Sequence, residues 1–387
     1  MIGHILKLIW NKKGSNALMI LEIFLAFLVL FFVLAYVLHN LKMTSAPLGF
    51  ETVDRWQVKL DNLDKLDSLE MKTTIENLES NLLALDEVES VSFANSISPF
   101  SGSMWTTGND ENGFEFSAMM VPADNELANT LDLNMVEGRW FTEDDYNATY
   151  KPIVMTKFFM EKYYPGKSMI DSTFELQGTR KIVGVVEAYK YRGAFEELYP
   201  TVLLLEPKED NNSSVLLKMK AGTPTSFEEK LSNMVNTTTK STGNIIVNLE
   251  KERIAEDRES WMIFIALLSI CGFLCVNVAL GLFGVLWYNI NKRKSEIGLR
   301  QALGAYGIDI TKQFILEVMI LTLVALVVGI FFAIQVPLLD LTEYPSTMFY
   351  KSIAYASLII LTLVFVCALF PSFQAAKITP ANSLHED

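Results

Sequence analysis

Residues 17–38 read ALMILEIFLAFLVLFFVLAYVL, an apolar run with a single acid, Glu22. A bilayer core of about 30 Å needs about 20 apolar residues in a helix, so this run predicts a first membrane span. A secretory signal peptide has an apolar region of only about 7–15 residues, which favours a retained anchor. Cleavage near the small residues at 44–46 stays open as the alternative.

Three further apolar runs have the length of membrane spans. They are predicted at 261–287, at 314–336, which contains the acid Glu317, and at 353–370. Half of the 387 residues are hydrophobic and 20% are charged, a balance that excludes a disordered chain, a collagen and a disulfide-rich scaffold. The composition therefore indicates a membrane protein that also has a large water-exposed part.

Lysine and arginine lie unevenly around the four spans. They precede the first span, crowd the loop at 288–313 and follow the fourth span, whereas the external loop at 337–352 holds only Lys351. Loops rich in these residues stay in the cytoplasm. We therefore expect both termini to be cytoplasmic and residues 39–260 to lie outside. The predicted fold class is a membrane protein of four transmembrane α-helices, with a large α+β extracytoplasmic domain inserted between helices 1 and 2.

The predicted extracytoplasmic domain, 39–260, has one strand–helix–strand pattern before a strand-rich middle and a second one after it. We expect two lobes, the first formed by about 44–125 and 206–250 and the second, an inserted β lobe, by about 126–205. The highly charged residues 250–260 predict a helical stalk that continues into the second span. The domain carries 37 acidic and 22 basic side chains, which does not favour nucleic acid as a partner.

The two ends of the chain are predicted to lie at the cytoplasmic membrane surface. Residues 1–16 place apolar residues at helical spacing among bases, a pattern typical of an amphipathic helix in the headgroup plane. An ordinary basic flank is the alternative. Residues 371–387 are expected to form a cytoplasmic tail.

No motif in the chain indicates catalysis, a cofactor or a metal. The string YYPGKS at 163–168 lacks the first glycine of a phosphate-binding loop, because Glu161 stands there, and a Pro-Gly turn is the better interpretation. The three histidines have neither the spacing of a metal site nor that of a catalytic triad. The many outer acids are interpreted as a solvated surface. A third interpretation, an outer-facing membrane enzyme, is therefore disfavoured, because the sequence offers no recognisable group of catalytic residues for it.

Polar and small residues inside the spans are candidates for a function. Glu22 and Glu317 lie within about two turns of the inner surface, and an intramembrane acid is costly. Two interpretations of these acids are open. We favour the one in which each carboxylate reaches the headgroup layer or pairs with a nearby base, rather than the one in which the acids relay protons. Cys271, Cys275 and Ala279 recur every four residues and predict a helix-packing face rather than a metal site.

The loop after the second span reads NKRKSEIGLRQALGAYGIDITKQFILE over 291–317 and resembles the signature of the MacB/FtsX-like permeases of ABC transporters. The matching residues are Glu296, Gly298, Arg300, Ala302, Gly304, Ala305, Phe314 and Glu317. FPSFQAAKITPANSL at 370–384, EGRWFTEDD at 137–145 and IVGVVEA at 182–188 resemble other parts of the same family. The order of one span, a large outer domain and three spans also matches.

This resemblance implies a non-catalytic permease subunit in the inner (cytoplasmic) membrane of a bacterial cell, with a mechanotransmission mechanism of the type VII class. It implies a separate ABC ATPase subunit and a second permease copy or a paralogue, as a homodimer or a heterodimer. A periplasmic adaptor and an outer-membrane channel stay open as further partners. The expected function is export or extrusion of a peptide, antibiotic, lipid or lipoprotein. The alternative is an FtsX-type signalling scaffold that activates an extracytoplasmic hydrolase.

The loop at 288–313 is the expected contact with the ATPase, because it is predicted to be cytoplasmic and is too short to fold as a domain. Its candidate coupling residues are Glu296, Gly298, Arg300, Ala302, Gly304 and Ala305. The small residues allow a short helix to approach a partner closely. Glu296 and Arg300, four residues apart, can pair with each other or with the partner, and Gly304 is suited to end the helix.

Overall fold

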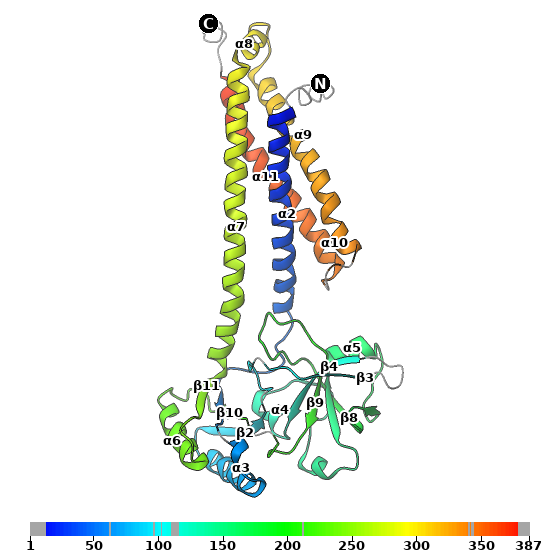
Figure 1. Cartoon of the computed structure of the whole chain (residues 1–387), viewed down its shortest axis with the longest axis vertical. Coiled ribbons are helices and arrows are strands. Elements are labelled where there is room, and N and C mark those ends of the chain that lie inside the picture. The colour runs from blue at the N-terminus through cyan, green and yellow to red at the C-terminus, as the bar shows by residue number, and fades with distance from the viewer. Residues whose placement is uncertain are drawn as a thin grey trace. The chain divides into compact units, whose positions relative to one another are not determined.

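The computed structural model describes residues 13–61, 63–95, 97–101, 103–109, 116–210, 213–339, 341 and 344–377 (Figure 1). The chain divides into two compact units. We call Met1–Asn40 together with Met262–Asp387 the helical unit, and Leu41–Trp261 the inserted unit. Most of the expected amphipathic helix at 1–16, and the tail after residue 377, lie outside the described residues.

In the described part of the chain, four long helices confirm the expected number of membrane-spanning segments. They are α2 (Lys13–Thr44), α7 (Leu249–Lys292), α9 (Gly307–Ala333) and α11 (Ser346–Ala376). Each has the length and hydropathy needed to cross a membrane. Two short helices, α8 (Lys294–Ala302) and α10 (Gln335–Leu338), precede and follow α9 in the chain. α2 and α7 are longer than the apolar runs because their polar end turns are helical too.

Close packing holds the helical unit together. Phe27 and Phe31 of α2 are fully buried, in one core with the fully buried Ala325 of α9 and Ala356 of α11. Gly329 of α9 lies against the Phe27 ring, since a Cβ at residue 329 would come within 2.5 Å of the ring carbon Cδ1. In lipid there is no exclusion of water to drive helices together, so such contacts between small and large side chains carry the association.

The first sheet of the inserted unit has four antiparallel strands in the order β11-β1-β10-β2. They are β1 (Arg55–Lys59), β2 (Val88–Ala94), β10 (Ser214–Met219) and β11 (Ile245–Asn248). Helices α3 (Ser68–Leu83) and α6 (Phe227–Thr239) share one apolar core with this sheet. The Asp67 carboxylate begins α3 by accepting hydrogen bonds from the backbone N–H groups of Leu69 and Glu70. The two strand–helix–strand segments thus form a two-layer structure, in which one layer is the four-stranded sheet and the other consists of α3 and α6.

The second sheet is mixed, with strand order β3-β4-β9-β6-β8-β5 and β7 paired to β8. Its strands are β3 (Thr106–Asn109), β4 (Phe116–Ala123), β5 (Met135–Gly138), β6 (Pro152–Thr156), β7 (Thr173–Glu175), β8 (Thr179–Val186) and β9 (Thr201–Leu205). The helical segments that accompany the two sheets are η1 (Leu63–Lys65), α4 (Leu127–Leu131), η2 (Glu143–Asn147) and α5 (Lys157–Tyr163). The β4–β9 and β6–β8 pairs are parallel and the others are antiparallel.

The strand pairing moves one predicted lobe boundary. The sequence assigned residues 44–125 to the first lobe, but β3 and β4 belong to the second sheet, where β4 pairs with β9. The buried positions of β4 explain why it takes a place inside the sheet. Its hydrophobic run shows that it is buried, but a run of this kind carries no information about which strand lies beside it.

A buried carboxylate joins the two sheets. Asp124 follows β4 and is fully buried. Its side chain accepts hydrogen bonds from Ser92 Oγ at 2.7 Å and from the backbone N–H of Phe93 at 2.8 Å, both on β2. Burial raises the pKa of Asp124 to about 6, although these hydrogen bonds act against the rise. The first and second sheets are therefore tied by polar contacts as well as by apolar packing.

Candidate coupling site

Helix α8 is bounded on both sides by breaks in the helical backbone. Arg293, which separates α7 from α8, has a φ of −109° and a ψ of 16°. At the other end Gly304 has a φ of +97°, and its N–H donates to the Gln301 carbonyl at 3.0 Å. The Ala305 N–H donates to the Arg300 carbonyl at 3.0 Å, which completes a Schellman motif. Gly304 therefore ends α8 through its left-handed backbone.

Five side chains form a closed ring that fastens α8 to α9. Arg293 Nη1 donates to both carboxylate oxygens of Glu317 at 3.1 Å, and its Nε lies 3.4 Å from Glu296 Oε2. Arg300 donates to Glu296 Oε1 at 2.5 Å and to Gln313 Oε1 at 2.7 Å. The Gln313 amide donates to Glu317 Oε1 at 3.1 Å, which closes the ring.

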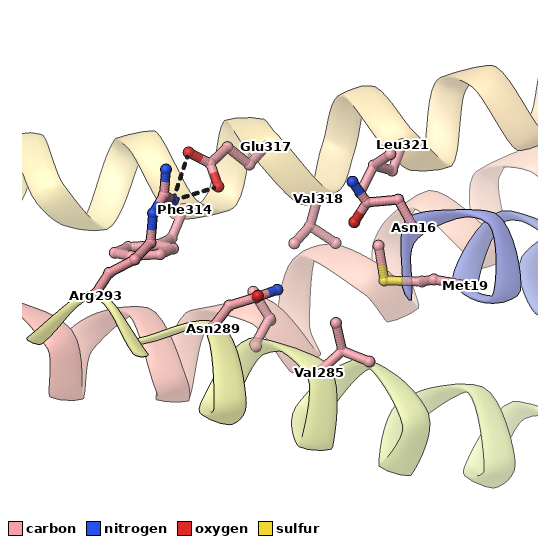
Figure 2. Close-up of a pocket in the computed structure, with 10 residues that line it drawn as sticks. Asn16, Met19, Val285, Asn289, Arg293, Phe314, Glu317, Val318 and Leu321 are labelled. Carbon is pink, nitrogen blue, oxygen red and sulfur yellow. Dashed lines mark hydrogen bonds and ion pairs between the residues drawn. The ribbon is translucent and has the colours of Figure 1, made fainter. Parts of the chain in front are cut away.

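The part of the ring around Arg293 is shielded from solvent. The side chains of Arg293 and Glu317 are 11% and 17% exposed, and the guanidinium lies over the Phe314 ring, 5.9 Å from its centroid (Figure 2). Phe314 also belongs to a small apolar core with Ile297 of α8 and Ile310 of α9. Charged and apolar contacts thus both hold α8 against α9.

A small cavity lies beside this ring, between α2, α7 and α9 (Figure 2). Its volume is about 30 Å³, and Asn16, Asn289, Arg293 and Glu317 supply its polar lining. Pockets that bind small-molecule ligands have volumes of about 300–1,000 Å³. The cavity therefore has room for one or two water molecules but not for a nucleotide or a transported molecule.

Large apolar side chains are exposed on α8, on the turn that follows it and at the start of α9. We call these four the α8 patch: Leu299 is 54% exposed, Leu303 80%, Tyr306 76% and Ile308 63%. The sequence reasoning missed them because it looked for small residues and charges. They could have been found by looking for large apolar residues within the loop at 288–313, because its lysines and arginines predict that this loop lies in the cytoplasm.

The structure distributes the six predicted coupling residues over different roles. Glu296 and Arg300 meet in the ring, and Gly304 ends the helix with Ala305 in its cap. Gly298 is buried within the unit, whereas Ala302 is exposed. A partner can therefore reach residue 302 but not residue 298.

The intramembrane acids differ in their surroundings. Glu317 lies in the ring, whereas Glu22 packs on Gly281 of α7, where an added Cβ would come within 2.7 Å of Glu22 Oε2. Within the described ranges no hydrogen bond or ion pair to the Glu22 carboxylate is present. Cys271 is buried in the helical core, and Cys275 and Ala279 are half-buried. Among the residues that the structure describes, no three His, Cys, Asp or Glu side chains gather to hold a metal ion.

Known proteins match nearly the whole chain. The MacB-like periplasmic core domain matches residues 17–253, and the FtsX-like permease C-terminal domain matches residues 261–380. The uncharacterised ABC transporter permease YvrN of Bacillus subtilis (strain 168) is 24% identical over 281 residues, which are 67% of this chain and 68% of that one. The macrolide export ATP-binding/permease protein MacB of Bartonella quintana (strain Toulouse) is 23% identical over 70% of this chain, but the match spans only 43% of that protein.

Among solved structures, the periplasmic region of MacB from Actinobacillus actinomycetemcomitans matches 54% of this chain with 12% identity and a TM-score of 0.38. The two family matches follow the order of the structure, with the first covering α2 and the inserted unit and the second covering the remaining helices. The chain therefore belongs to the family of MacB/FtsX-like permeases of ABC transporters.

Proposed function

We propose that this chain is the non-catalytic permease subunit of an ABC transporter, and that it couples ATP hydrolysis by a separate cytoplasmic ATPase to motion of its inserted unit. The α8 patch is the observation that carries the proposal. The proposed activity of the transporter is export or extrusion of a peptide, an antibiotic, a lipid or a lipoprotein. The match of the inserted unit to the MacB-like periplasmic core domain supports export over the scaffold role.

The α8 patch has the chemistry of a protein-docking surface. Large apolar side chains that are exposed in a segment predicted to lie in water mark a candidate interaction site, and each large apolar side chain that leaves water stabilises a complex by about 1.5–3 kcal/mol. The ring beneath α8 holds the helix in one position, so docking does not have to order it. A partner that pushes on the patch therefore also pushes on α7 and α9.

The charge of the flanking segments supports a cytoplasmic partner. The segment that carries the patch also contains Lys292, Arg293, Lys294, Arg300 and Lys312, and loops with this composition stay in the cytoplasm. In this orientation both termini lie on the ATPase side and the inserted unit lies on the outer side of the inner membrane. A second permease copy or a paralogue completes the transporter, because the permeases that the sequence resembles act as dimers.

The test replaces Leu303 by Asp in the full chain and measures how much ATPase co-purifies from native membranes. A buried carboxylate in place of a leucine should lower the amount of ATPase by about tenfold or more, since about 1.4 kcal/mol corresponds to a tenfold change in affinity. Leu339 is also exposed, at 63%, but follows α10 on the predicted external side. Leu339→Asp is therefore the matched control and should retain the ATPase.

Ala302→Trp and Arg300→Glu provide weaker versions of the same test, because residue 302 is exposed and Arg300 is engaged in the ring. Gly298→Trp is unsuitable, since a bulky side chain there would disturb the unit itself. Retention of the ATPase at wild-type amounts by Leu303→Asp would show that the α8 patch is not the contact.

A further inference from the structure

The loop between β8 and β9 contains a lysine buried among backbone carbonyls. This segment, YKYRGAFE at 189–196, is called the 189–196 loop. Lys190 is only 1% exposed, and its Nζ donates to the carbonyls of Met43 at 2.6 Å, Ala46 at 3.2 Å and Ala194 at 3.1 Å. Burial lowers the pKa of Lys190, and the carboxylates of Glu196 and Asp257 act in the opposite direction. Three acceptors therefore satisfy the three donors of one ammonium group.

Two of these acceptors belong to the end of α2. Met43 lies in the last turn of α2 and Ala46 just beyond it. The last carbonyls of a helix have no partner within the helix and carry a partial negative charge, which a lysine ammonium group stabilises. Lys190 thus serves as the cap of the helix that leads from the first membrane span into the inserted unit.

The backbone strengthens this attachment. The N–H of Lys190 donates to the carbonyl of Leu48 at 2.9 Å. Gly49, with a φ of +94°, lies so close to the loop that an added Cβ would come within 1.9 Å of the Ala188 carbonyl oxygen. Any side chain at residue 49 would force the two segments apart. The segment after α2 and the start of the 189–196 loop are therefore in close contact over several residues.

The other half of the loop is attached to the first turns of α7. The Ala194 N–H donates to Asp257 Oδ1 at 3.2 Å, and Asp257 Oδ2 accepts from Arg253 at 2.9 Å. Phe195 packs edge-on against Trp261, with 5.7 Å between the ring centroids. All of these residues lie within the inserted unit. One eight-residue loop therefore holds the chain segments that lead to two different membrane helices.

The loop is itself anchored in an apolar core to which both sheets contribute. Tyr191 is 1% exposed within the apolar core of the inserted unit, and its carbonyl accepts from the Phe100 N–H at 2.6 Å. Glu196 Oε2 accepts from the Arg192 N–H at 2.8 Å, which closes the loop on itself. A force applied to either attached segment therefore reaches the core of the β lobe directly.

We propose that the 189–196 loop is a rigid two-point joint, which fastens the inserted unit to the ends of both α2 and α7 and in which Lys190 is the positioning residue. This inference rests on the proposed function, since it assigns how motion of the membrane helices reaches the inserted unit. The predicted stalk at 250–260 provides one attachment, and the joint adds a second attachment at the end of α2. With two attachment points, the inserted unit has to follow α2 and α7 together.

The experiment uses the full chain with its co-purified ATPase in lipid vesicles, after the native cysteines have been replaced by serine. Spin labels on cysteines at the exposed positions Asn77, in the inserted unit, and Lys351, in the helical unit, report a distance with and without ATP. Lys190→Met should abolish the ATP-dependent change while the ATPase still co-purifies. Lys181→Met removes an exposed lysine of the same lobe that pairs with exposed Asp171, and it should retain the change.

A cross-link separates loss of the joint from loss of the fold. Met43 and Ala194 contribute carbonyls to the same ammonium group, so cysteines at 43 and 194 should react with one short bifunctional thiol reagent. If the joint is rigid, the cross-linked wild type keeps its ATP-dependent change, and the cross-link restores that change to the Lys190→Met protein. A cross-link that blocks the wild-type change would show that the joint opens during the cycle and would overturn the proposal.

The remaining outcomes are equally distinct. A wild-type response in uncross-linked Lys190→Met would show that Lys190 does not hold the joint. Absence of an ATP-dependent change in the wild type with ATPase bound would contradict the proposed function itself. Resistance of the inserted unit to protease, compared between Lys190→Met and Lys181→Met, shows whether the unit is folded in each protein.

Discussion

Arg293 in the helical unit and Lys190 in the inserted unit are both buried bases at places where separate chain segments meet, but their partners differ in kind. Arg293 pairs with two carboxylates, those of Glu317 and Glu296. Lys190 donates only to backbone carbonyls, two of them at the end of α2. Direct ion pairs balance the charge of Arg293, whereas backbone carbonyls take all three hydrogen bonds of Lys190 and the carboxylates of Glu196 and Asp257 act on it without direct contact.

The difference shows how the surroundings of each base determine the partners it needs. Arg293 follows a membrane-spanning helix, where a charge without a counter-charge is costly. A guanidinium also has a planar fork that matches a carboxylate. Lys190 lies in a water-exposed unit, where a compact ammonium can donate hydrogen bonds to three carbonyls that approach from two chain segments. Arginine thus suits a contact between side chains, and lysine suits the capping of a chain end.

The largest expected effect comes from neutralising a carboxylate partner of Arg293. Glu317→Gln should lower the free energy of unfolding by about 3 kcal/mol, because it leaves a largely shielded guanidinium with only the more distant Glu296 as a counter-charge. Glu22→Gln makes the same chemical change at an acid that has no ion pair in the described part of the chain, and it should cost less than about 1 kcal/mol. Thermal unfolding of both purified variants in detergent checks the difference. Equal losses would show that the ring has no special role.

Removal of the ammonium at Lys190 should have an intermediate effect on stability. Lys190→Met leaves three carbonyls without their donor but breaks no direct ion pair, so we expect a loss of about 1–3 kcal/mol. Urea unfolding followed by tryptophan fluorescence measures it, with Lys181→Met as the reference. If Lys190→Met lowers the free energy of unfolding as much as Glu317→Gln does, the claim that charged partners matter more than backbone carbonyls is wrong.

The smallest effect concerns a carboxylate near Lys190 and depends on pH. Burial raises the pKa of Glu196 to about 7, whereas an unfolded chain has a glutamate pKa of about 4.3. A pKa raised by folding contributes stability that is complete below about pH 4 and is lost as the pH rises through about 7. Glu196→Gln should therefore be more stable than the wild type by about 1 kcal/mol at pH 8 and nearly equal to it at pH 5.

Melting temperatures at intervals from pH 5 to pH 8 test this dependence. Glu161→Gln, at an exposed glutamate on α5, is the control and should follow the wild-type curve. Asp124, whose pKa burial also raises, remains in every variant and contributes a change of the same sign near pH 6. If Glu196→Gln and the wild type differ equally at all pH values, Glu196 does not titrate in the folded protein.

Much of the fold could be predicted because its signals are local. The apolar run at 17–38 identifies its helix by length alone, and the alternation in β2 indicates a strand without reference to its partner. The place of β4 could not be predicted, because its neighbour β9 lies about 80 residues later in the chain. Hydrophobicity reports that a strand is buried, whereas strand order depends on contacts between distant residues.

The sites show the same limit. The pairing of Glu296 with Arg300 follows from helical spacing, and Gly304 follows from the rules for helix ends. The bond from Arg293 to Glu317 requires α8 to fold back on α9, which no spacing reveals. Lys190 has no sequence signal at all, since a lysine in a polar loop is usually solvated. Only the structure shows that its surroundings are backbone carbonyls.

The strand order of the first sheet also constrains how the protein is made. β1 pairs with β10 and β11 but not with β2, and its Arg55 lies opposite Lys218. During synthesis and secretion, β1 and β2 must therefore wait until residues 214–248 have emerged. The strands of the second sheet all lie between β2 and β10 in the chain, so this sheet can form first. The waiting strands are an aggregation hazard during this interval, because formation of long-range pairs is slow and leaves strand edges unpaired.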